Sequence, residues 1–100
     1  MDEVDVLNEE IAQNLAELFR AFSDPSRLRI ISVLKSGELN VGTLAEKVGL
    51  SKSATSHQLR GLRQMRLVAT QKVGRQVFYR LDDEHIKDLY TRGLEHVQHD

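Results

Sequence analysis

The 100-residue sequence contains no cysteine and no tryptophan, and it has one proline and five aromatic residues. Without cysteine it cannot form disulfides, thiolate metal sites or thiol redox sensors. It also lacks an apolar run near the roughly 18 residues that a membrane-spanning helix needs. Its acidic start, Met1-Asp2-Glu3, differs from a signal or transit peptide. We therefore expect a soluble, cytoplasmic protein without membrane contact, whose small core consists mainly of Leu, Val and Ile.

Acidic residues are missing from the middle of the chain. Residues 51–80 carry seven Lys or Arg and no Asp or Glu, although the whole chain has a net charge of only −1. The flanking segments are acidic, with five basic against nine acidic residues in 1–50 and two against six in 81–100. A long segment of one charge sign is typical of a surface that binds a polyanion. A basic face that serves only solubility would normally mix both signs.

Apolar residues recur at helical spacing in five segments, and turn residues separate these segments. Asp24-Pro25 is a helix N-cap followed by the residue favoured at the first helical position. Gly74-Arg75 lies between two β-leaning segments and indicates a hairpin. The pattern predicts one domain over residues 1–100, with helices at 7–22, 25–36, 41–48, Ser51 or Ser53 to Met65, and 82–97, and strands at 67–72 and 76–81.

The predicted fold class is mainly α with a β-hairpin wing. Two short helices within residues 41–65 make a helix-turn-helix, and the hairpin over 67–81 forms its wing. The outer face of the second helix is polar, so that short hydroxyl groups can approach base edges while arginines reach phosphates. Such a face is common, but the acid-free segment and the basic wing make the interpretation more specific. The candidate DNA contacts are Lys52, Ser53, Ser56, His57, Arg60, Arg63, Lys72 and Arg75.

Three of the four histidines lie in the last 16 residues, in the pattern Asp83-x-His85 followed by His96-x-x-His99. His85 and His96 return to nearly the same helix face, but they lie about 16 Å apart along the axis, too far for one metal ion. His96 and His99 are neighbours at i and i+3. Asp83 approaches His85 only if it lies at the helix start, where the backbone is still non-helical.

Two half-sites at opposite ends of one helix can be completed by a twofold dimer. The helices of two copies packed antiparallel would form two identical sites, each with Asp83 and His85 from one copy and His96 and His99 from the other. Three imidazoles and one carboxylate suit tetrahedral Zn²⁺ and, in vitro, Co²⁺. The alternative is that these are solvated residues favoured by the helix dipole.

The segments 7–22 and 82–97 both carry apolar stripes that a three-helix core plus hairpin cannot cover. We therefore expect a homodimer through these two helices. The candidate metal site has four protein ligands and no open position, which favours a regulatory role over an enzymatic one. A metal-dependent hydrolase would need an open coordination position and a nearby general base.

Three segments of this sequence carry recognisable motifs: Asp24-Pro25-Ser26-Arg27-Leu28-Arg29-Ile30-Ile31, Leu50-Ser51-Lys52-Ser53-Ala54-Thr55-Ser56-His57-Gln58-Leu59 and Gly74-Arg75-Gln76-Val77-Phe78-Tyr79-Arg80-Leu81. Together they resemble the ArsR/SmtB family of dimeric winged-helix, metal-sensing repressors. The histidine pattern is similar to that of the zinc-sensing branch. The Cys-x-Cys of arsenic, cadmium and lead sensors is absent from residues 38–44, and no histidine in the first 50 residues offers the extra ligand of nickel or cobalt sensors.

The resemblance implies a repressor whose metal-free dimer binds an inverted-repeat operator in double-stranded DNA. Zinc would then weaken DNA binding and derepress a metal-efflux or sequestration gene. Two alternatives stay open at this point. One is a cobalt- or nickel-responsive repressor of the same fold, and the other is a winged-helix regulator that metal does not control.

Overall fold

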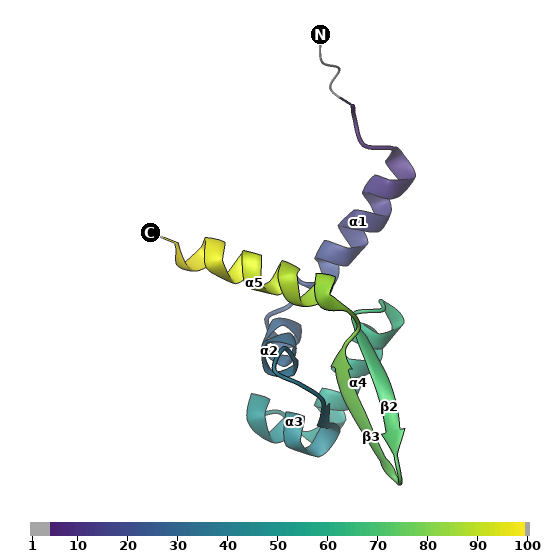
Figure 1. Cartoon of the computed structure of the whole chain (residues 1–100), viewed down its shortest axis with the longest axis vertical. Coiled ribbons are helices and arrows are strands. Elements are labelled where there is room, and N and C mark those ends of the chain that lie inside the picture. Colours follow the sequence, from purple (N-terminus) through teal and green to yellow (C-terminus); the bar gives the residue numbers. More distant parts are fainter. Residues whose placement is uncertain (1–4, 100) are drawn as a thin grey trace.

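The computed structural model describes residues 5–99, so the acidic start Met1-Asp2-Glu3 lies outside the described part. The five predicted helices and the hairpin are confirmed (Figure 1). Helices α2, α3 and α4 form the body, α5 crosses one end of it, and α1 projects away from it (Figure 1). The elements are α1 Glu9–Ala21, α2 Pro25–Leu34, β1 Leu39–Asn40, α3 Val41–Val48, α4 Lys52–Gln64, β2 Val68–Val73, β3 Gln76–Leu81 and α5 Glu84–Gln98.

Short polar side chains begin each helix, as the sequence chemistry requires. Asp24 accepts a hydrogen bond from the Ser26 N–H at 3.0 Å, and Pro25 follows it in the first helical position. The sequence left the start of α4 open between two serines, and Ser51 is the cap, since it accepts from the Ala54 N–H at 3.0 Å. Caps therefore fix where each helix starts relative to the turn before it.

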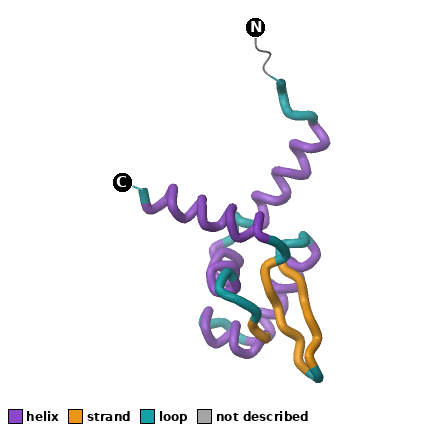
Figure 2. Tube along the Cα trace, viewed as in Figure 1, coloured by secondary structure: helices purple, strands orange, loops and turns teal. Residues whose placement is uncertain are grey.

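The hairpin is part of a three-stranded antiparallel sheet in the order β1-β3-β2, a strand more than the sequence predicts. The additional strand β1 pairs Leu39 with Tyr79 and Asn40 with Phe78. Two residues are too few to show an alternating pattern, so periodicity cannot detect such a strand. In the hairpin, Val73 pairs with Gln76 across Gly74, whose φ of 62° suits the tight turn. Figure 2 shows the strands gathered on one side of the helices.

The hydrophobic core lies between α2, α3 and α4 and extends to the base of the hairpin and to Ile86 of α5. One buried polar group, the Thr55 hydroxyl, donates to the Ser51 carbonyl at 2.8 Å and is therefore satisfied. No helix within residues 5–99 is long and apolar enough to cross a membrane. The largest fully buried side chains are Ile30, Ile31, Leu34, Leu44, Leu59, Leu62 and Leu67.

Helix α1 contributes little to this core. Only its C-terminal end is anchored, with Ala21 buried and Leu18 packed against the core. Its remaining large apolar side chains are about half exposed, including Ile11 at 54% and Phe19 at 50%. An apolar stripe on a projecting helix is an interaction surface without its partner.

Candidate nucleic-acid interface and metal half-sites

Helix α4 separates an apolar inner face from a polar outer face. Thr55, Leu59 and Leu62 are buried against the body. This packing determines which face of α4 lies inward and leaves the intervening positions on the outer side, because consecutive residues differ by about 100° around a helix. Ser56 is half-buried, and the exposed candidates on this helix are Lys52, Ser53, His57, Arg60 and Arg63.

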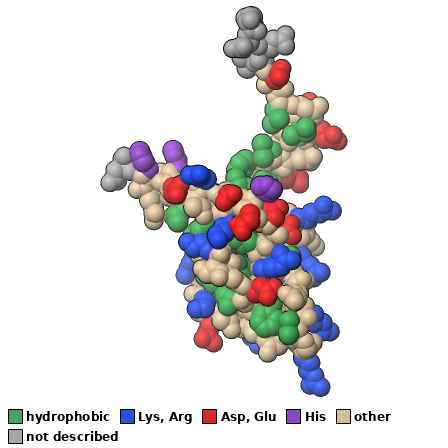
Figure 3. Space-filling model, viewed as in Figure 1, with side chains coloured by type: hydrophobic (Ala, Val, Ile, Leu, Met, Phe, Trp, Pro, Cys, Tyr) green, Lys and Arg blue, Asp and Glu red, His purple; other side chains and the backbone are tan. Residues whose placement is uncertain are grey.

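The wing carries the remaining candidates on exposed strand and turn positions. Lys72 lies near the end of β2, and Arg75 follows Gly74 in the turn. Arg80, by contrast, is engaged, since its Nε lies 3.8 Å from Glu38 Oε2 on the loop before β1. Lys and Arg side chains line the hairpin side of the body to its tip, with others on the opposite side, while most acidic side chains in this view lie around α1 and α5 (Figure 3).

Asp83 and His85 meet at the start of α5 under the condition that the sequence analysis set. Asp83 is the N-cap, with an extended backbone at φ −151° and ψ 178°, and it accepts the Ile86 N–H at 3.2 Å. The same carboxylate oxygen lies 3.5 Å from His85 Nδ1. Desolvation opposes ionisation of Asp83, but the Ile86 N–H and His85 outweigh it, so its pKa lies below the usual value.

The other two candidate ligands lie at the opposite end of the same helix. His96 belongs to the last turn of α5, whereas His99 is the C-cap with an extended backbone at φ −75° and ψ 131°. The His99 N–H donates to the His96 carbonyl at 3.3 Å. Figure 3 shows histidine side chains at both ends of α5. Within residues 5–99 of one chain, no three His, Asp or Glu side chains gather into a metal-binding group.

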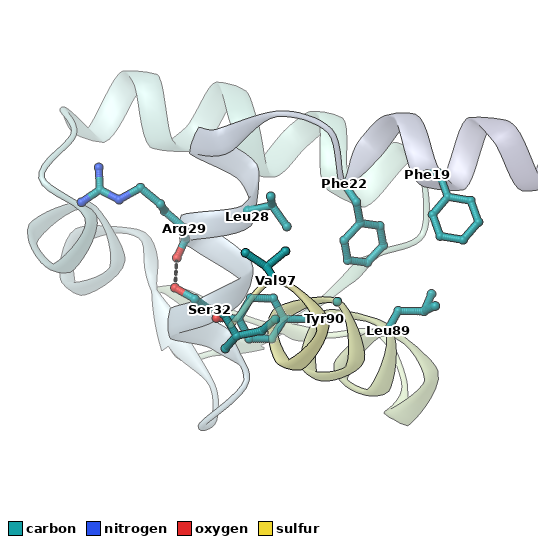
Figure 4. Close-up of a pocket in the computed structure, with 10 residues that line it drawn as sticks. Phe19, Phe22, Leu28, Arg29, Ser32, Leu89, Tyr90 and Val97 are labelled. Carbon is teal, nitrogen blue, oxygen red and sulfur yellow. Dashed lines mark hydrogen bonds between the residues drawn. The ribbon is translucent and has the colours of Figure 1, made fainter. Parts of the chain in front are cut away.

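An apolar groove runs between α1, α2 and α5, and helical periodicity predicts its apolar stripes but not the groove that they form together. It has a volume of about 510 Å³. Phe19 of α1 and Phe22, the C-cap residue that follows α1, face Leu89 and Tyr90 of α5 across it (Figure 4). The stripes over 7–22 and 82–97 indicated an unsatisfied apolar surface, but the groove also takes residues from α2. Its other lining residues are Leu28, Arg29, Ser32, Gly93, Leu94 and Val97.

Comparison with known proteins places these features in a family. The profile described as "Bacterial regulatory protein, arsR family" matches residues 24–70, from the cap of α2 into β2. A transcriptional repressor SmtB homolog from Synechocystis sp. is 48% identical over 94 residues, covering 94% of this chain and 71% of that protein. The HTH-type transcriptional regulator NmtR from Mycobacterium tuberculosis is 40% identical over 93 residues, covering 93% and 78%.

One of these two relatives also has a solved structure with a similar fold. The solution structure of apo-NmtR matches with a TM-score of 0.82 at 37% identity and covers 100% of this chain and 84% of that one. Both named relatives are transcriptional regulators. The comparison confirms the prediction of a regulatory rather than an enzymatic protein.

Proposed function

Because this chain belongs to the ArsR family of bacterial regulatory proteins, we propose that it is a homodimeric, metal-responsive transcriptional repressor. The metal-free dimer binds an inverted-repeat operator, and Zn²⁺ bound between the protomers releases it. The observation that carries the metal part of the proposal is the contact of 3.5 Å between Asp83 and His85 at the start of α5. It pairs a carboxylate with an imidazole on the helix that ends in His96 and His99.

The proposed DNA-binding surface consists of the outer face of α4 and the wing. A basic surface without acidic side chains attracts phosphates, and the hydroxyl groups of Ser53 and Ser56 are short enough for close approach to base edges. His57, Arg60 and Arg63 extend this face along α4. Lys72 and Arg75 of the wing supply further phosphate contacts, and Lys52 does so at the start of the helix.

The proposed dimer buries the apolar faces of α1 and α5. Apolar side chains of α1, such as Ile11 and Phe19, are about half exposed in their own protomer. The groove beside them is apolar, and Val97 at the end of α5 is 81% exposed. A second copy supplies matching apolar surface, because a twofold interface places the same patch on both sides.

The proposed metal site draws on both protomers. Asp83 and His85 of one chain meet His96 and His99 of the other when the two α5 helices run antiparallel. Neutral imidazoles and a carboxylate are ligands that Zn²⁺ accepts in tetrahedral sites, and Co²⁺ accepts the same set. Two features suit Asp83 to bind a metal ion. Its lowered pKa favours the ionised carboxylate, and the hydrogen bond from the Ile86 N–H orients that carboxylate.

Release from DNA follows from the placement of a metal half-site at each end of α5, within the same dimer that carries the two α4 helices. Ligands from both protomers that held one Zn²⁺ would cross-link the two α5 helices. The fixed α5 pair favours one spacing of the two α4 helices, and an operator that matches another spacing is then bound less tightly. In the cytoplasm this would derepress a metal-efflux or sequestration gene.

The test combines metal titration with DNA binding. The purified protein selects a tight-binding inverted repeat from a random duplex pool, and fluorescence anisotropy follows that duplex with and without Zn²⁺. We expect tight binding by the metal-free dimer and loss of at least tenfold in affinity with zinc, a coupling of about 1.4 kcal/mol. Unchanged affinity would leave a regulator that metal does not control. Stronger release by Co²⁺ or Ni²⁺ than by Zn²⁺ would reassign the metal.

A further inference from the structure

Arg27 connects the start of α2 to the middle of α4. Its Nε donates a hydrogen bond to Gln58 Oε1 at 3.2 Å, across 31 residues of sequence. The same Nε lies 3.6 Å from Asp24 Oδ2, the carboxylate whose other oxygen caps α2. The guanidinium is therefore held from one side by the cap of its own helix and from the other by a side chain of α4.

The guanidinium lies along one turn of α4. A Cβ on Gly61 would lie 3.7 Å from Arg27 Nη2, so the group spans Gln58 and Gly61, which are three residues apart on one face. His57 and Arg60 each precede one of these two positions. A change in the rotation of α4 at Gln58 would redirect His57 and Arg60 together.

Arg27 is less exposed than any other cationic side chain that is paired with a carboxylate in residues 5–99, the next being Arg80 at 47%. The side chains of Arg27 and Asp24 are 26% and 36% exposed, whereas those of Arg20 and Glu17 are 70% and 74% exposed. Arg92 and Glu95, at 83% and 61%, are also solvated. Exposed pairs contribute little to stability, while a half-buried hydrogen bond to a charged group holds its partners more firmly.

We propose that Arg27 is a positioning residue for α4: it sets the rotation of the recognition face through Gln58 without touching DNA. The inference rests on the proposed DNA binding by α4. Leu28 and Arg29, the next two residues on α2, line the apolar groove assigned to the dimer interface, whereas the Arg27 guanidinium lies against α4.

The test uses Arg27→Met, which keeps the aliphatic stem and removes the donor, and Gln58→Leu, which removes the acceptor. Affinity is measured by anisotropy for the inverted repeat selected by the unaltered protein and for a random duplex of equal length. We expect each variant to lose about five- to tenfold in affinity for the selected duplex, as for one lost hydrogen bond of this kind. Affinity for the random duplex and its salt dependence should stay within twofold of the unaltered protein.

Three further measurements separate positioning from other roles. The double variant should bind no worse than either single variant, because both remove the same contact. Arg27→Lys, which keeps a charged donor, should recover most of the lost affinity. Arg20→Met, with the same change in charge on α1, should leave both affinities unchanged. Circular dichroism and sedimentation of each variant confirm that the compared proteins are folded and equally dimeric.

Two outcomes overturn the inference. Equal loss on both duplexes with a shallower salt dependence would make Arg27 a phosphate contact. Unchanged affinity for the selected duplex in Arg27→Met would show that the contact does not position α4. Failure of the proposed function is distinguishable from both, because the unaltered protein would then select no duplex from the pool.

Discussion

Asn40 and Gln76 join the helix-turn-helix to the wing. Asn40 Nδ2 donates to Gln76 Oε1 at 2.7 Å, while Asn40 Oδ1 accepts the Thr43 N–H at 2.8 Å and caps α3. One amide therefore serves both elements, and the short strand β1 places it beside β3. The wing is thereby held at a defined position relative to α3.

The two functions of Asn40 can be separated by substitution. Asn40→Ala removes the cap and the link to the wing and should cost about 1 kcal/mol in the free energy of unfolding. Asn40→Ser keeps a capping oxygen but is too short to reach Gln76, so most of that stability should remain. Urea unfolding compares the two, with Gln76→Ala as the control that removes the link alone. Equal destabilisation by Asn40→Ser and Asn40→Ala would show that the cap contributes nothing.

The projecting helix α1 gives a test of the dimer. Phe19 is 50% exposed and lines the apolar groove, so Phe19→Glu would place a charge in the proposed interface while the core keeps its packing. We expect a folded monomer at micromolar concentration by sedimentation, with a helical circular dichroism spectrum. Gln13→Glu, a change of equal charge at an exposed position of the same helix, should remain dimeric. A dimeric Phe19→Glu protein would place the interface elsewhere.

The wing should contribute to DNA affinity without reading sequence. Arg75→Ala removes an exposed charge at the tip and should weaken binding to all duplexes, lowering the slope of log affinity against log salt by about one.

Arg60→Ala on α4 should act similarly. Ser56→Ala should affect the selected operator more than a random duplex.

Arg80 supplies the matched control for Arg75. Its guanidinium is engaged by Glu38 at 3.8 Å, so Arg80→Ala should change the salt slope less than Arg75→Ala does. If Arg75→Ala leaves both the affinity and the slope unchanged, the wing is not a DNA contact.

A mixed dimer tests whether the metal ligands come from two chains. One protomer carries His96→Ala and the other His85→Ala. One site then loses His85 and His96 and keeps only Asp83 and His99, whereas the other site keeps all four ligands. We expect this heterodimer to bind one Zn²⁺ tightly, while either homodimeric variant loses one ligand from both sites and binds tens-fold or more weakly, as is typical of losing a ligand. The measurement is zinc stoichiometry by competition with a chelating dye.

DNA binding gives the control for the mixed-dimer experiment. Metal-free operator affinity should be the same for all three dimers, since none of the changes touches residues 51–80. If both homodimeric variants bind zinc normally and zinc still releases them from DNA, the four-residue site is wrong. These histidines would then be solvated residues at the helix ends.

Asp83 should make stability depend on pH even without metal. Its pKa is lower in the folded chain than in the unfolded one, because the Ile86 N–H and His85 stabilise the carboxylate. The resulting stabilisation is fully present above the unfolded pKa and is lost as pH falls through the folded pKa. Asp83→Asn keeps a good cap but has no charge, so urea unfolding should show a deficit at neutral pH that closes in acid. A deficit independent of pH would contradict the ionic contribution.

The helices and the hairpin of this fold are predictable from local sequence chemistry. Contacts between residues far apart in the sequence are the part that could not be predicted. The caps Asp24 and Ser51 and the turn at Gly74 are determined by a few neighbouring residues, so the helices and the hairpin follow from the sequence. The link between Arg27 and Gln58 joins positions 31 residues apart, and no local pattern predicts it. Such a contact exists only once α2 and α4 have packed.

The candidate metal site also has one part that neighbouring residues determine and one part that they do not. The approach of Asp83 to His85 depends on Asp83 being the N-cap of α5, a position that local sequence chemistry predicts and the structure has. The position of His99 does not follow from the i and i+3 rule, because α5 ends at Gln98 and His99 adopts an extended backbone. Helix ends are set by competition among weak terminal hydrogen bonds, which periodicity does not resolve.

The weak attachment of α1 to its own body has a kinetic consequence for the proposed dimer. If each α1 is packed mainly by the other protomer, two subunits can part only when both helices lose their cover. Exchange of subunits between preformed dimers would then be slow, and the thermal midpoint of unfolding would rise with protein concentration. In a cell, newly made chains would then pair with one another, and they would not mix with the subunits of older dimers until those dimers dissociate.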